Sequence, residues 1–322
     1  MRILWFWQYD PDYAFDEWFH LDYVRWMSRQ GIDIKVFGPG VFESPYRDLA
    51  FSPFETYVTL KAMQQSWPFN IIVCNTKSRM HYNYVPRQKH DDNCWLPKDF
   101  ADYECPKVII EEDYQYEDDP LWYMTHEFNM ILQRHYSNFL LTKYLYPSKW
   151  LPFSVDTEVF KPSNKERLHK AVFLGHKAHE IYVDRKWATF KLRHQLDDYG
   201  EKIITGKEYI EKLRSYDLAL CPSGIYNMTF AKLFEIASCG TVPLVNSHPG
   251  YGLEKLFSIG NYVSFHNDCF DIEEKVKAAL DDQQSIKRKS EYIREEVIEK
   301  HSHEVRTKQL MEILDECCST YK

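Results

Sequence analysis

The strongest constraint on the fold is an alternation of short apolar runs with amphipathic segments, which continues along most of the 322-residue chain. In the first half, apolar runs at 1–7, 32–37, 69–75 and 107–112 are typical of strands, and Phe15–Arg29 carries its apolar residues at helical spacing. Strands buried on both faces of a parallel sheet have this continuous apolar composition. The pattern predicts an α/β fold with helices on both faces of a parallel sheet.

A second series of the same kind begins after residue 152. Strands are expected at 171–175, 202–205, 217–221 and 242–246, and helices at 187–199, 229–239 and from about 271 to 318. We therefore expect a first domain over 1–152, a second over 153–300, and a C-terminal helix over 301–322 that packs back on the first domain. Ligands of open α/β sheets bind beyond the carboxyl ends of the strands, so we expect the two domains to face each other across a ligand-binding cleft.

Composition excludes several classes of protein. The net charge of −8 argues against a chain whose whole surface binds nucleic acid. No apolar run approaches the roughly 18 residues that cross a bilayer, so no transmembrane segment and a cytoplasmic location are predicted. The eight cysteines form no Cys-x-x-Cys pair, and no His/Cys cluster has metal-ligand spacing, so no metal site and no cofactor are expected.

The stretch 216–246 combines a strand, a small loop and a helix. Thr229 is the expected N-cap of this helix, and Gly240 is its expected stop. The first N–H groups of a helix and its positive dipole end suit a diphosphate, to which Lys232 can add a cation. Glu235 lies about one turn later and can accept hydrogen bonds from two ribose hydroxyls. The alternative is an ordinary capped helix on which Lys232 and Glu235 are solvated.

Four segments together resemble the group 1 glycosyltransferases with the two-domain GT-B fold, and in particular their spore-maturation-protein-like branch. The resemblance covers roughly residues 150–315, and the first half only in outline. The segments that carry it are KLFEIASCGTVPLV at 232–245, LPFSVDTEVFKP at 151–162, AVFLGH at 171–176 followed by YVDR at 182–185, and HSHEVR at 301–306.

This resemblance implies a nucleotide-diphosphate sugar, such as a UDP-sugar, bound mainly by the second domain. Gly175 would let the backbone approach the donor, Arg185 and Lys232 would neutralise the diphosphate, and Glu235 would hold the ribose. The remaining positions implied on the donor side are Ser223, Gly224, Asn227 and Thr229. Asn227 departs from the family, which has a glutamate there, so the sugar and the mechanism stay open. Arg185 could instead form a surface salt bridge, and Asn227 could be a turn residue.

The first domain offers the candidates for catalysis. Asp113 follows the strand at 107–112 and could accept the proton of an acceptor hydroxyl. His20 is a second possible base or a contact to the donor sugar, although a histidine within a helix can equally be structural. The basic and aromatic stretch Lys77–His90 suits a phosphate-rich acceptor, including DNA, or is a solvated loop.

These observations predict a metal-independent, hexosyltransferase-like enzyme that moves a sugar from a nucleotide-diphosphate donor to an acceptor hydroxyl. The acceptor is open: a glycan, a small molecule or a hydroxymethylated DNA base. One alternative function is phage-type glycosylation of hydroxymethylated DNA bases, which the stretch Lys77–His90 favours. A second is a non-catalytic nucleotide-sugar binding protein, which the departure at Asn227 suggests, and a third is a sugar-nucleotide epimerase.

Overall fold

A computed structural model describes residues 1–7, 22–44, 47–51, 59–75, 96–111, 120–177, 182–200, 202, 204–223, 228–248 and 251–321. The chain divides into two compact units. The first unit contains residues 1–134, 138–151 and 307–322, and the second contains residues 135–137 and 152–306. The chain therefore crosses from the first unit to the second near residue 152, and returns near residue 307.

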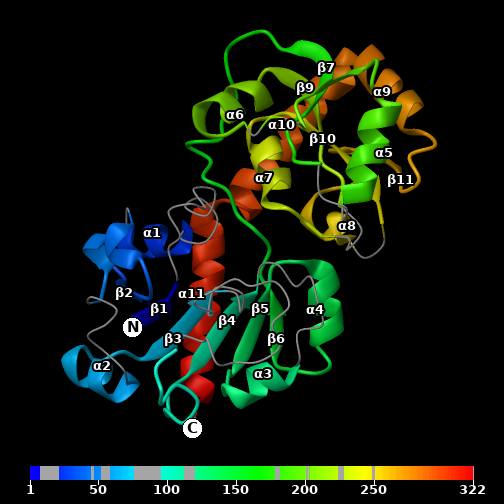
Figure 1. The fold of residues 1–322 in the computed structure, drawn as a ribbon. Helices are drawn as coiled ribbons and strands as arrows, with labels where there is room; N and C mark the ends of the chain where they lie inside the picture. Colours follow the sequence, from blue (N-terminus) through cyan, green and yellow to red (C-terminus); the bar gives the residue numbers. More distant parts are fainter. Residues whose placement is uncertain are drawn as a thin grey trace. The chain divides into compact units, whose positions relative to one another are not determined.

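The described part of the first unit is built on a six-stranded sheet in the order β2-β1-β3-β4-β5-β6, in which every pair is parallel (Figure 1). Its strands are β1 (Arg2–Phe6), β2 (Asp33–Phe37), β3 (Ile71–Asn75), β4 (Lys107–Glu111), β5 (Met130–Gln133) and β6 (Ser148–Trp150). Its helices are α1 (Asp22–Arg29), α2 (Leu60–Ser66), α3 (Pro120–Thr125) and α4 (Tyr136–Thr142), with 3-10 turns η1 (Val41–Glu43) and η2 (Arg47–Leu49).

The C-terminal helix α11 (His303–Thr320) completes this first unit from residue 307 onward. Leu310 and Leu314 on α11 are fully buried and share one apolar core with Ile3 and Trp5 of β1. Figure 1 shows α11 running along the strands of this sheet. The expected return of the chain to its first half is therefore confirmed, and the last helix is part of the first unit's core.

The second unit is built on a five-stranded parallel sheet in the order β11-β10-β9-β7-β8 among the described residues (Figure 1). Its strands are β7 (Leu168–Phe173), β8 (Leu196–Asp198), β9 (Tyr216–Leu220), β10 (Val242–Ser247) and β11 (Val263–His266). Its helices are α5 (Val183–Lys191), α6 (Gly206–Leu213), α7 (Ala231–Ser238), α8 (Leu253–Leu256), α9 (Ile272–Asp281) and α10 (Gln283–Lys300). Two parallel sheets confirm the α/β class predicted from the apolar runs.

Two expectations for the second unit are wrong. The helix expected over 187–199 ends at Lys191, and Leu196–Asp198 form the edge strand β8 instead. Leu192 and Leu196 have helical spacing, but Leu196 is buried beside Ala171 of β7, where a strand can pair. The strand expected at 202–205 is absent from its described residues, and helix α6 begins directly after them.

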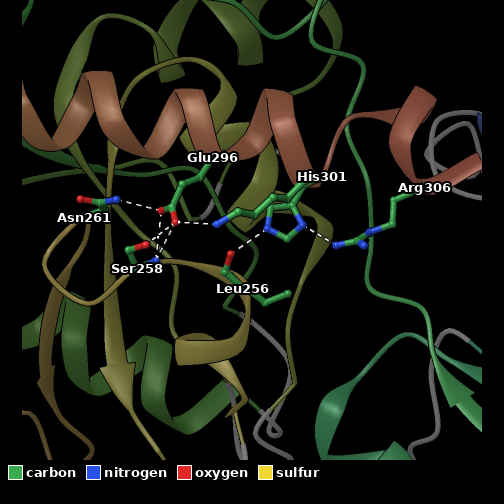
Figure 2. A network of polar contacts seen from close by, with 7 residues as sticks. Leu256, Ser258, Asn261, Glu296, His301 and Arg306 are labelled. Carbon is green, nitrogen blue, oxygen red and sulfur yellow. Dashed lines mark hydrogen bonds and ion pairs between the residues drawn. The ribbon is translucent and has the colours of Figure 1, made fainter. Parts of the chain in front are cut away.

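A buried carboxylate ties the end of α10 to the segment after α8 (Figure 2). Glu296 accepts hydrogen bonds from the backbone N–H and the hydroxyl of Ser258, the latter at 2.5 Å. It also accepts from the side-chain amide of Asn261 at 2.8 Å and from the ammonium of Lys300 at 3.2 Å. Burial opposes ionisation, but these hydrogen bonds outweigh it and lower the pKa of Glu296.

His301 follows directly and joins the same region to the start of α11 (Figure 2). Its Nε2 lies 2.8 Å from the carbonyl oxygen of Leu256, and its Nδ1 contacts the guanidinium of Arg306. Because a guanidinium only donates, Nδ1 must accept and Nε2 must carry the proton. Burial, followed by the charge of Arg306, lowers the pKa of His301 to about 3. The imidazole is therefore neutral at the point where the chain leaves the second unit.

Among the helices that the structure describes, none is long and apolar enough to cross a membrane. Within the same ranges, no three His, Cys, Asp or Glu side chains come together as potential metal ligands.

Candidate functional site

The described residues expected to bind the donor lie at the carboxyl edge of the second sheet and on two helices. Gly175 and Ser223 follow strands β7 and β9, Arg185 is on α5, and Lys232 and Glu235 are on α7. β7 and β9 are parallel neighbours, so Leu174–Gly175 and Cys221–Ser223 leave the sheet at the same edge. Helix α7 begins after the loop that follows β9. This is the edge at which open parallel sheets bind ligands.

Gly175 is a position where a side chain has no room. A Cβ added there would lie 2.7 Å from the ring of Phe173, which is itself buried, and 3.6 Å from Nζ of Lys232. The missing side chain thus lets the backbone after β7 approach the ammonium of Lys232 closely. The position fits the expected backbone approach to a donor, a role that stays a prediction.

Replacing Gly175 by alanine is expected to destabilise the protein by about 1–3 kcal/mol, because the new methyl group overpacks against the ring of Phe173. Chemical denaturation of Gly175→Ala against the wild type measures this loss. The variant Phe173→Leu in the Gly175→Ala background should recover part of it, since a smaller side chain makes room. Additive losses in the double variant would contradict the predicted contact.

Helix α7 starts one residue later than a Thr229 cap requires. Phe230 is its N-cap and provides no side-chain hydrogen bond. The hydroxyl of Thr229 is buried and donates instead to the carbonyl oxygen of Tyr251 at 3.1 Å, so the expected capping role is wrong. Gly240 ends the helix as predicted, with a left-handed φ of 69°. The N-cap residue therefore offers no side-chain acceptor to the first backbone N–H groups of α7.

Lys232 lies in the first turn of α7 and is half-buried. Its Nζ donates to the carbonyl oxygen of Leu174 at 3.1 Å and lies 5.4 Å from the centre of the Tyr209 ring. Burial lowers the pKa of Lys232, and the nearby charge of Arg185 lowers it further, while Glu235 opposes the shift. A bound anion would relieve both penalties on this ammonium.

Arg185 projects from the first turn of α5 and rests on two aromatic rings. Its guanidinium carbon lies 3.8 Å from the ring centre of Tyr182 and 4.8 Å from that of Phe230, the residue that begins α7. One nitrogen donates to the carbonyl oxygen of His176 at 2.8 Å. These contacts hold the cation beside the start of α7.

Arg185 and Lys232 share one electrostatic environment, because each acts on the other and both act on the buried thiol of Cys221. Across the described ranges, neither forms an ion pair with a carboxylate. The surface salt bridge considered for Arg185 is therefore not formed there. Two neighbouring cations without an acidic partner create a positive site that suits a diphosphate.

Glu235 is only 6% exposed. Its Oε2 accepts a hydrogen bond of 2.6 Å from the hydroxyl of Tyr209, a residue of α6. The solvated glutamate of the alternative interpretation is excluded by this burial. Binding of ribose by Glu235 stays a prediction.

Ser223 and Thr229 are both buried and hydrogen-bonded within the second unit. The backbone N–H of Ser223 donates to Oδ1 of Asn246 at 2.7 Å, and the Asn246 amide donates to the Ser223 hydroxyl at 2.9 Å. Asn246 also donates to Asn267 at 3.1 Å. Ser223 and Asn246 are both buried, so these hydrogen bonds fix the backbone of Ser223 at the carboxyl end of β9.

Four of the predicted site residues lie outside the described residues: His20 and Asp113 in the first unit, and Gly224 and Asn227 in the second. The basic stretch Lys77–His90 lies outside them too. Within the described residues, the structure brings together Gly175, Arg185, Lys232 and Glu235. Tyr209 and Asn246, which contact this group or its loop, were not predicted, since no local pattern distinguishes them from ordinary core residues.

Most of the second unit is similar in sequence to a known protein family. A family described as glycosyl transferase-like matches residues 164–312. No curated protein matches the chain by sequence. The matched range contains Gly175, Arg185, Lys232 and Glu235.

Solved structures share the whole fold at low sequence identity. A glycosyltransferase from Rickettsia africae ESF-5 is 11% identical, with 99% of each chain covered and a TM-score of 0.68. Anabaena Alr3699/HepE in complex with UDP and glucose is 11% identical, covering 98% of this chain and 100% of that one, with a TM-score of 0.65. An α-glucosyltransferase bound to UDP-glucose and DNA is 13% identical, covering 98% and 99%, with a TM-score of 0.61. The GT-B fold expected from the sequence is thereby confirmed.

Proposed function

We propose that this chain is a glycosyltransferase that binds a nucleoside-diphosphate sugar through its second unit and transfers the sugar to an acceptor hydroxyl. The observation that carries the proposal is the pair Arg185 and Lys232, two cations without a carboxylate partner among the described residues, beside the first turn of α7. The family match over residues 164–312 supports it, because that range contains this site.

The chemistry follows from the charges. When the bond between the anomeric carbon and the diphosphate oxygen breaks, the diphosphate takes the electron pair and its negative charge grows. Arg185, Lys232 and the first N–H groups of α7 would stabilise that charge in the transition state. The acceptor oxygen forms the new bond to the anomeric carbon and gives up its proton. In this proposal Asp113 accepts that proton and His20 contacts the donor sugar or acts as the base.

Arg185 and Lys232 take the neutralising role, so the proposed reaction involves no divalent metal. Glu235 binds the ribose hydroxyls of the donor. UDP-sugars are the first donors to test, because structures of Anabaena Alr3699/HepE hold UDP, glucose and UDP-glucose in the same fold.

Binding of UDP is expected to raise the melting temperature by about 5 °C or more once UDP exceeds its Kd a hundredfold, because a ligand that binds only the native state stabilises it. Arg185→Ala and Glu235→Ala should each weaken UDP binding about tenfold, since each removes a charged partner of the nucleotide. Thermal shift and calorimetric titration measure both effects.

Lys186→Ala removes an exposed cation next to Arg185 and is the matched control, which should bind UDP like the wild type. Failure of UDP, GDP, ADP, CDP and dTDP alike to shift the melting temperature would contradict the proposed donor site.

Transfer to hydroxymethylated DNA remains the alternative for the acceptor. The matching α-glucosyltransferase structure contains DNA, but its identity of 13% extends only to the fold. No contact among the described residues selects DNA over a glycan or a small molecule.

A further inference from the structure

Tyr209 contacts two charged side chains of the proposed donor site, Glu235 and Lys232. It reaches from α6 to α7, where its hydroxyl donates to Oε2 of Glu235 at 2.6 Å. The centre of its ring lies 5.4 Å from Nζ of Lys232, within the range of a cation–π contact. A single aromatic side chain therefore contacts both the carboxylate and the ammonium.

The ring of Tyr209 also packs against a second aromatic residue, Phe160. Phe160 packs on it edge to face, with 6.3 Å between the ring centres. The carbonyl oxygen of Phe160 accepts a hydrogen bond from the hydroxyl of Ser238, at the end of α7. The segment 152–162, which carries the chain into the second unit, is thus fastened to the same helix that bears Lys232 and Glu235. Tyr209 has little freedom to leave its position, and it is 9% exposed.

We propose that Tyr209 is a positioning residue that orients the carboxylate of Glu235 toward the ribose of the donor and supports the ammonium of Lys232 at the diphosphate. This inference rests on the proposed function, and it divides the role of Tyr209 between two atom groups. The hydroxyl serves the ribose, and the ring serves the diphosphate.

The direction of the hydrogen bond is fixed by chemistry. Burial, and then the negative charge of Glu235, raise the pKa of Tyr209 well above its ordinary value. The hydroxyl therefore keeps its proton and always donates to the carboxylate. With one oxygen held by Tyr209, the plane and rotamer of Glu235 are set before the nucleotide arrives, so ribose binding does not have to order a mobile side chain.

Two variants of Tyr209 separate the two roles. Tyr209→Phe keeps the ring under Lys232 and removes only the hydroxyl, whereas Tyr209→Leu removes both. Each is titrated with UDP, 2′-deoxy-UDP and UMP by calorimetry. The ratio of affinities for UDP and 2′-deoxy-UDP reports the ribose contact, and the ratio for UDP and UMP reports the diphosphate contact.

We expect the wild type to prefer UDP over 2′-deoxy-UDP, and Tyr209→Phe to lose about five- to tenfold of that preference, the usual size for the loss of one hydrogen bond. The preference of Tyr209→Phe for UDP over UMP should stay as in the wild type. Tyr209→Leu should lose part of both preferences. In turnover with UDP-glucose, Tyr209→Phe should raise KM more than it lowers kcat.

Tyr216→Phe is the matched control. Its hydroxyl donates to a carboxylate oxygen of Asp197 at 2.8 Å, and it is also a buried tyrosine of the second unit. Tyr216 begins β9, so it lies at the amino end of the strand, away from the loop that follows the carboxyl end. This variant should lose stability as Tyr209→Phe does, but keep both affinity ratios.

The outcomes separate the inference from the proposed function. If the wild type binds no nucleoside diphosphate, the proposed function fails and the inference fails with it. If the wild type binds UDP but does not prefer it over 2′-deoxy-UDP, or if Tyr209→Phe keeps the full preference, only the role of Tyr209 is overturned. Loss of both ratios in Tyr216→Phe would also overturn it, because the effect would then be one of general stability.

Discussion

Lys232→Met is expected to lower kcat/KM for UDP-glucose by about 10²- to 10³-fold, the cost of removing one preorganised group that stabilises charge in a transition state. Lys232 is suited to this role because it is half-buried and lies near the like charge of Arg185, whose repulsion a bound anion would offset. Its ammonium donates a hydrogen bond to the carbonyl oxygen of Leu174. An incoming diphosphate would therefore meet a cation that forms no ion pair with a carboxylate of the described residues.

The measurement is release of UDP from UDP-glucose, with and without acceptor, together with the affinity for UDP. Lys212→Met is the matched control, because Lys212 is also a half-buried lysine of the second unit, 4.0 Å above the ring of Tyr199. We expect Lys212→Met to retain wild-type turnover. Equal losses in both variants, or wild-type turnover in Lys232→Met, would remove Lys232 from the mechanism.

Acidification from pH 7 to pH 4.5 is expected to destabilise the wild type through His301, by up to about 1.4 kcal/mol for each pH unit below the unfolded-state pKa. The folded state lowers the pKa of His301 from 6.5 to about 3, so the unfolded chain binds a proton that the native state excludes. The stabilising contribution is therefore complete above pH 6.5 and is lost as the pH falls toward 3. Protonation would set an N–H of His301 against the guanidinium of Arg306 (Figure 2).

Urea denaturation across this pH range tests the effect. His301→Gln cannot take up the proton, so its stability should vary less with pH than that of the wild type, whatever its absolute value at pH 7. His169→Gln is a control, because His169 is expected to change the pH dependence of stability in the opposite direction. The hydrogen bond to Asp217 raises the pKa of His169, whose contribution is present at low pH and lost as the pH rises. An unchanged pH dependence in His301→Gln would contradict the buried neutral imidazole.

The fold was largely predictable because most strands are buried on both faces. β3 and β4 are buried at every residue, so the apolar runs at 69–75 and 107–112 mark them without ambiguity. β6 was not predicted, because its sequence Ser148–Trp150 is half-buried and too polar to differ from a loop. The sequence predicts helix at β8, because Leu192 and Leu196 are four residues apart, as on one face of a helix. The same spacing also fits a turn followed by an edge strand, which is what the structure has.

In the proposed donor site, the charged residues could be predicted from the sequence, but the residues that hold them in place could not. Lys232 and Glu235 could be placed from their offsets within one helix. Tyr209 could not, because its hydrogen bond to Glu235 joins residues 26 positions apart and depends on how α6 packs beside α7. Thr229 was assigned to the cap by residue type, whereas tertiary packing gives its hydroxyl to the carbonyl oxygen of Tyr251.

The placement of α11 has a consequence for the order of biosynthesis. Leu310 and Leu314 belong to the same core as Ile3 and Trp5, whereas the second unit is contiguous from residue 152 to 306 apart from a few residues of the earlier chain. During translation the second unit has all of its sequence while the first still lacks its final helix. The first unit, which is synthesised before the second, is therefore completed after it, and until then β1 exposes apolar surface that a chaperone could cover.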